Sequence, residues 1–136
     1  MASHYIKEIK AVQPTAPYYI GGYCDHGIIA LEIAHQLEAA GEKVAAVILF
    51  ESYFSGIAKR MHYQIKEYSG KVILFRGSSR KFWKRDDPLM GWSDYFTGEV
   101  ETYAIKGRLL GIFKEPGVVK LAENIERSLE KIGNRY

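Results

Sequence analysis

The sequence has little of what would indicate a disulfide-bonded, membrane-spanning or nucleic-acid-binding protein. One cysteine in 136 residues excludes an internal disulfide framework and a multi-cysteine metal site. No apolar run approaches the roughly 20 residues that a membrane-spanning helix needs, and no signal-peptide pattern opens the chain. A net charge of +3 is too small to indicate nucleic-acid binding. We therefore expect a cytoplasmic protein that uses no membrane, nucleic acid, metal or cofactor.

The length and composition fit one soluble domain over residues 1–136, with 47% hydrophobic and 26% charged residues. The densest basic stretch, residues 76–85, also contains Phe82 and Trp83 and is followed by two aspartates. We interpret it as a solvated loop, with a patch for an anionic partner as the alternative.

Strand-like and helix-like segments alternate along the chain. Apolar spacing predicts amphipathic helices over residues 2–12, over 27–40 and from Pro116 onward, and a short helical connection over 53–69. The expected strands are 18–22, 44–50, 72–75 and 99–105, of which the last alternates like a half-exposed edge strand. This order predicts a parallel sheet with helices on both faces.

The stretch from Tyr18 to Gly27 carries the clearest functional signal. A short apolar strand enters a glycine pair, makes one polar excursion at Cys24, Asp25 and His26, and continues into a helix. Strand, sharp turn and helix form the geometry of the G-x-S-x-G elbow, which lifts one side chain clear of the sheet as a nucleophile. Here a cysteine occupies the apex, and His26 replaces the second glycine of the motif.

Cys24 has two interpretations: a working nucleophile, or an inherited residue at a vestigial elbow. A cysteine nucleophile needs a base within reach. His26 is only two residues away on the same turn, so we expect its ring to project elsewhere than toward the sulfur. Cys24, Asp25 and His26 are too few and too poorly spaced for a metal site.

With these elements placed, the sequence resembles the thioesterase domain of nonribosomal peptide and polyketide synthases, an α/β-hydrolase. Residues 5–52 resemble the family's segment from the helix before the elbow to the strand that bears the triad acid. Residues 70–79, 86–105 and 113–132 resemble its last third. The resemblance implies hydrolysis or transfer of an acyl group from a carrier-protein thioester, with an acyl carrier protein as a partner.

The resemblance also assigns site positions. The nucleophile falls on Cys24, the acid on Glu51, and one oxyanion donor on the backbone N–H of Asp25. His26 is the alternative base, because the family's histidine position falls on Leu109. Without an imidazole, nothing removes the thiol proton or protonates the leaving group, so we expect impaired catalysis.

Two further parts of the family pattern are missing. The chain begins at the helix before the elbow, without the preceding strands and the oxyanion donor that they carry, and the lid is reduced to residues 53–69. We expect a truncated, partial α/β-hydrolase fold of about four parallel strands, with the elbow strand Tyr18–Gly22 at an exposed edge. Such an edge invites pairing with another chain, which predicts a homodimer. The alternatives to an enzyme are a non-catalytic interaction or scaffold module and a remnant of a synthase gene.

Overall fold

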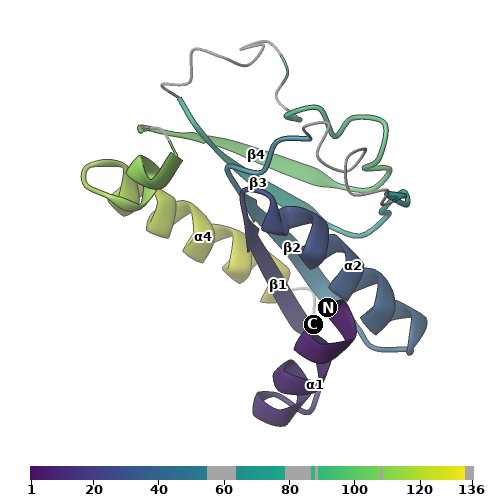
Figure 1. Cartoon of the computed structure of the whole chain (residues 1–136). Helices are drawn as coiled ribbons and strands as arrows, with labels where there is room; N and C mark the ends of the chain where they lie inside the picture. Colours follow the sequence, from purple (N-terminus) through teal and green to yellow (C-terminus); the bar gives the residue numbers. More distant parts are fainter. Residues whose placement is uncertain (55–63, 79–86, 88, 108, 134–136) are drawn as a thin grey trace.

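A computed structural model describes residues 1–54, 64–78, 87, 89–107 and 109–133. At its centre is a four-stranded parallel sheet in the order β1-β2-β3-β4 (Figure 1). The strands are β1 (Tyr18–Tyr23), β2 (Val44–Phe50), β3 (Val72–Gly77) and β4 (Val100–Ile105). This arrangement confirms the predicted partial α/β fold with four parallel strands.

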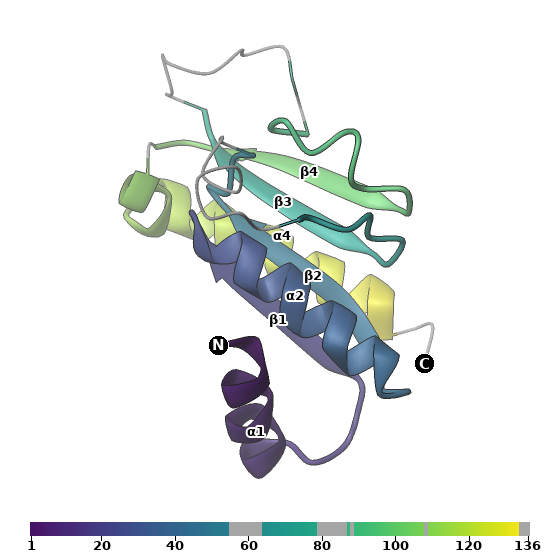
Figure 2. The same cartoon turned by 45° about the vertical axis from the view of Figure 1, so that its right-hand side comes forward.

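Helices cover both faces of the sheet, as predicted. Helix α2 (His26–Ala39) covers one face, and helix α1 (Ala2–Val12) packs against α2. The 3-10 helix η1 (Leu109–Phe113) and the long helix α4 (Gly117–Gly133) lie on the other (Figure 2). Helix α2 ends where predicted, because Gly41 takes a left-handed φ of 82° that suits glycine.

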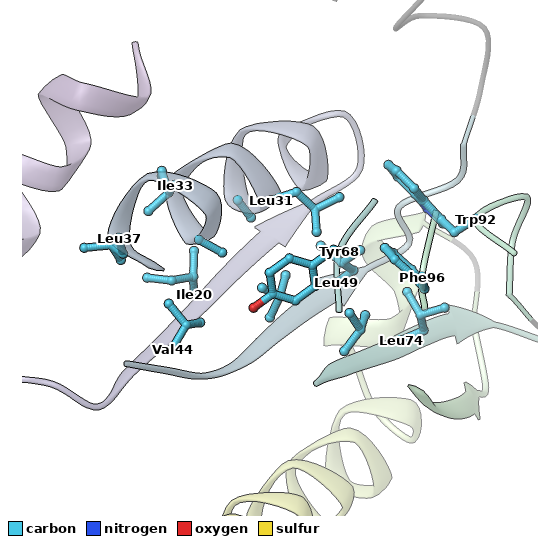
Figure 3. Packing of buried hydrophobic residues seen from close by; sticks show 14 of the residues in the cluster. Ile20, Leu31, Ile33, Leu37, Val44, Leu49, Tyr68, Leu74, Trp92 and Phe96 are labelled. Atoms are coloured by element: carbon cyan, nitrogen blue, oxygen red, sulfur yellow. The ribbon is translucent and has the colours of Figure 1, made fainter. Parts of the chain in front are cut away.

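Two hydrophobic layers arise from the alternation of side chains along the strands. In β2, Val47 and Leu49 face α2, whereas Ile48 faces α4. The α2 layer continues to Leu74, Trp92 and other side chains beyond the helix (Figure 3). Burial on both faces explains why β2 and β3 read as nearly continuous apolar runs.

Among the described residues, strand β1 pairs with β2 alone, so it is an edge of the sheet, as predicted. Tyr18 and Ile20 are buried under α2, whereas Tyr19 on the other face is 40% exposed. Helix α1 stands beyond this edge, beside α2 (Figures 1 and 2). The homodimer expected through this edge stays a prediction.

The connection expected to be helical differs where it is described. Residues 64–67 form no helix, and Tyr68 makes an isolated bridge to Phe96. The Tyr68 N–H donates to Tyr95 O at 2.7 Å and the Thr97 N–H donates to Tyr68 O at 3.0 Å, so tertiary hydrogen bonds fix Tyr68. Residues 55–63, which include His62, and most of the basic stretch, 79–85, lie outside the described residues.

Candidate active site

The elbow brings Cys24 out of the sheet at the end of β1. Its backbone N–H still donates to Phe50 O at 2.9 Å, but its φ of 53° is left-handed. Left-handed backbone is uncommon for a residue with a Cβ and occurs where the surroundings impose it. The chain therefore reverses direction at Cys24 within one residue and begins α2 at His26.

Two glycines permit this tight turn. A Cβ on Gly22 would lie 2.6 Å from His26 O and 2.9 Å from the Gly27 backbone. A Cβ on Gly27 would collide with the side chain of Ser52, which follows β2. Strand and helix therefore approach closely at Gly22 and Gly27, while the intervening position tolerates the exposed His26.

The N-terminus of α2 directly follows Cys24. Asp25 is the N-cap residue, and its side chain makes no capping hydrogen bond. In the described part of the chain, the backbone N–H of Asp25 donates to no backbone carbonyl. A helix N-terminus favours negative charge, so this N–H is suited to an oxyanion formed at the Cys24 side of the turn.

Glu51 follows β2 as Cys24 follows β1. The preceding residues Tyr23 and Phe50 are register partners, so the structure brings the two predicted site positions to neighbouring strand ends. Glu51 is fully buried with a left-handed φ of 50°. Its carboxylate accepts a hydrogen bond from the Gly77 N–H at the end of β3.

Three of the four histidines lie in the part of the chain that the structure describes. His26 is exposed and lines a groove beside β1. His35 packs edge-on against Tyr68 with ring centroids 5.3 Å apart, and His4 lies on α1. In the residues that the structure describes, no hydrogen bond joins Cys24 to a histidine, and no three metal-ligating side chains gather.

The segment that carries Leu109 returns to the elbow. Leu109 opens η1, and Phe113 at the other end of η1 contacts the rings of Tyr23 and Phe50, each at 5.7 Å between centroids. The chain thus crosses from β4 back to the β1–β2 end of the sheet. The position that resembles the family's histidine therefore lies on a segment packed beside the elbow, but it carries leucine.

Sequence reasoning missed a row of aromatic side chains beneath the site. Tyr23, Phe50, Phe75 and Tyr103 are register partners across all four strands. Phe50 stacks on Phe75 at 5.5 Å, and Phe75 stacks on Tyr103 at 5.2 Å. The sequence does place an aromatic residue near the end of each expected strand. Only the register of the strands shows that these residues lie side by side.

A second missed contact supports the turn after Glu51. The indole N–H of the fully buried Trp92 donates to Ser52 O at 2.9 Å. Ser52 in turn sits against Gly27. The arrangement places a thiol, a backbone N–H group and a buried carboxylate at the neighbouring ends of β1 and β2.

Comparison with known protein families matches residues 1–67 to the family described as "Thioesterase domain". The chain is 30% identical, over 92% of its length, to a non-reducing polyketide synthase of Pseudevernia furfuracea. It is 44% identical, over 37% of its length, to tyrocidine synthase 3 of Brevibacillus parabrevis. The chain spans 6% or less of the length of such curated relatives.

Solved structures share the fold. The NocB thioesterase domain in covalent complex with a fluorophosphonate nocardicin G analog matches with a TM-score of 0.75 and 22% identity. That match covers 94% of this chain and 72% of the other. The surfactin-cyclizing thioesterase domain SrfTE matches with a TM-score of 0.73 and 17% identity, over 94% of this chain and 73% of the other.

Proposed function

We propose that this chain is a thioesterase-type domain that accepts acyl groups on Cys24 and releases them slowly, because residues 1–67 match the thioesterase-domain family and its relatives are polyketide and peptide synthases. The donor is a thioester of a carrier protein or of coenzyme A. The observation that carries this proposal is the elbow itself, in which Cys24 is held in a left-handed turn beside the Asp25 N–H.

The transfer step conserves the thioester bond. The Cys24 thiolate attacks the carbonyl carbon of the donor, and the oxyanion of the tetrahedral intermediate accepts a hydrogen bond from the Asp25 N–H. Collapse breaks the bond to the donor sulfur, which leaves as a thiolate. That thiolate takes up a proton from solvent, to which Cys24 lost its own. The products are acyl-Cys24 and a free thiol.

Hydrolysis of acyl-Cys24 needs a base that activates water. Glu51 would orient such a base, but the family's base position carries Leu109, and the described histidines make no hydrogen bond to Cys24. One positioned general base contributes about 10²–10⁴ in rate. We therefore place the impairment at acyl release, with His26 as the alternative base.

The second candidate function is a non-catalytic module that binds a carrier protein. Leucine at the histidine position favours it, because such a module needs the fold without the proton transfer. A non-catalytic module would form no covalent adduct, and this distinguishes it from a chain that accepts acyl groups on Cys24.

One experiment separates these functions. The protein is incubated with an acyl-N-acetylcysteamine thioester, thiol release is followed, and intact mass is measured. We expect one acyl group per chain and little further thiol release, with Cys24→Ala abolishing the adduct. Glu51→Gln is the matched variant, since it keeps the nucleophile. Sustained turnover that needs Cys24 would contradict impaired release, and a wild-type chain that never acylates would leave the carrier-binding module.

A further inference from the structure

On the side of β1 that faces away from β2, the backbone groups of Tyr19 and Gly21 have no hydrogen-bond partner among the described residues. The N–H groups of Tyr18 and Cys24 each donate at 2.9 Å toward the β2 side. Because backbone groups alternate along a strand, those of Tyr19 and Gly21 point away from β2. No second strand lies beside β1 in the described part of the chain. This side of β1 can therefore hydrogen-bond to another main chain.

A groove of about 370 Å³ runs along this edge, between α1, β1 and α2. Apart from Glu8, Gln13 and His26, its lining is apolar or aromatic, with Ile9 from α1 and Ile29 and Ile33 from α2. An aliphatic chain in this groove would make apolar contacts with the groove walls. It would leave the backbone groups of β1 desolvated and without hydrogen bonds. An extended peptide satisfies both, because it offers main-chain groups and apolar side chains together.

The wall formed by α1 is held in place. Lys10 Nζ bonds to Glu42 Oε1 at 2.9 Å, which raises the pKa of Lys10. The Tyr18 hydroxyl donates to Gln13 O at 3.1 Å, and Gln13 Nε2 donates to Pro17 O at 2.8 Å. These bonds tie α1 to the rest of the fold at its C-terminal end.

The position of α1 decides between a second copy and a lone peptide. A two-fold copy that paired its β1 with this edge would bring its own α2 over that strand, on the same face as the first α2. Helix α1 already stands there, beyond the edge and beside α2 (Figure 2). A segment without a helix on that face meets no such obstacle.

We propose that this groove binds an extended peptide segment, which adds to β1 as a fifth strand. Its alternate side chains that face α1 and α2 are apolar. Those on the other side, beside the 40% exposed Tyr19, are polar. The site does not depend on the chemistry of Cys24, so Cys24→Ala is expected to bind the same peptide.

Backbone methylation tests the proposal without changing the protein. The probe is a fluorescein-labelled seven-residue peptide of alternating valine and threonine with blocked ends, followed by fluorescence anisotropy. Two further peptides carry N-methyl groups on the valines only or on the threonines only. Since only alternate N–H groups of an added strand face β1, one methylated peptide should bind at least about tenfold more weakly, and the other should bind like the parent.

Two variants place the site on β1. Gly21→Pro removes an outward N–H at an edge position that tolerates proline, and it should abolish binding. Gly21→Ala keeps this N–H, and its Cβ meets only ordinary contacts at 3.6 Å, so binding should persist. Circular dichroism checks that both variants fold. If Gly21→Pro does not fold, the comparison of the two methylated peptides still decides the question.

Other outcomes overturn the proposal. No binding of the parent peptide, or equal binding of both methylated peptides, would contradict strand addition. A homodimer seen by light scattering and lost in Gly21→Pro would assign the groove to a second copy instead. A negative acylation test with normal peptide binding would remove the proposed function and leave this inference standing.

Discussion

The two edge strands of the sheet differ in chemistry and in surroundings. Strand β1 contains no charged residue, and a groove lies along its free side. Strand β4 carries Glu101, whose carboxylate accepts hydrogen bonds from Lys71 at 2.8 Å, Tyr103 at 2.9 Å and Ser128 at 3.0 Å. Ser128 lies on α4, so this network also ties α4 to the edge.

Electrostatics stabilise the β4 network in its charged form. Burial alone would lower the pKa of Lys71, but hydrogen bonds to Glu101 and Glu99 outweigh it and raise that pKa. Burial would likewise raise the pKa of Glu101, but its bonds to Lys71, Tyr103 and Ser128 lower it. Charged, bonded side chains are how natural sheets protect an edge. Among the described residues, β4 is therefore an edge held by charged side chains, whereas β1 carries none.

The largest expected change in stability distinguishes alanine substitutions at two neighbouring glycines of β1. Gly22→Ala places a Cβ against the backbone of His26 and Gly27, and we expect a loss of about 3 kcal/mol in unfolding free energy. The Cβ of Gly21→Ala meets only ordinary van der Waals contacts at 3.6 Å, so this variant should stay within about 0.5 kcal/mol of the parent. Urea unfolding measures both. Equal destabilisation would mean that β1 and α2 do not approach closely at the elbow.

The next effect breaks the β4 network. Lys71→Met leaves Glu101 without its cation, and because the Lys71 side chain is only 7% exposed we expect a loss of about 2 kcal/mol. Lys120→Met is the matched control, because its exposed pair with Glu123 should contribute less than about 0.5 kcal/mol. If both variants unfold at the same urea concentration, the network does not stabilise β4.

The pH dependence of stability tests the same network on β4. The folded pKa of Glu101 lies below its ordinary value of 4.5, so its stabilisation is present above that value. The stabilisation is lost as pH falls through the lowered pKa. We expect Glu101→Gln to be less stable than the parent at pH 7 and the two to converge in acid. Parallel stability curves from pH 7 downward would contradict the assignment.

The smallest effect concerns exposed positions on the two edges. Tyr19→Lys on β1 and Thr102→Lys on β4 should each change stability by less than about 0.5 kcal/mol, because both side chains reach solvent. Peptide binding should respond only to Tyr19→Lys, which places a charge at the open edge. A loss of binding in Thr102→Lys would move the binding site to β4.

Local patterns in the sequence predicted most of the fold. The apolar runs of β2 and β3 identified strands buried on both faces, and the glycine after α2 marked its end. Helix α1 begins at Ala2, where the apolar spacing predicts it. Helix η1 was missed because five residues show no helical period.

The candidate site was predictable only in part. The strand, turn and helix pattern pointed to Cys24, whereas Glu51 was assigned through the resemblance to the thioesterase domain. Their left-handed backbone and the bond from the Gly77 N–H to Glu51 depend on how neighbouring strands align. The return of η1 to Tyr23 depends on a crossing between opposite edges of the sheet. No local pattern encodes either relation.

The lifetime of acyl-Cys24 tests the central claim most directly. The protein is acylated, separated from excess donor, and followed by intact mass in buffer at pH 7. Without a base at the elbow, the adduct should decay at the rate of the same acyl group on glutathione in that buffer. Complete release within seconds, while the glutathione thioester persists, would contradict the account.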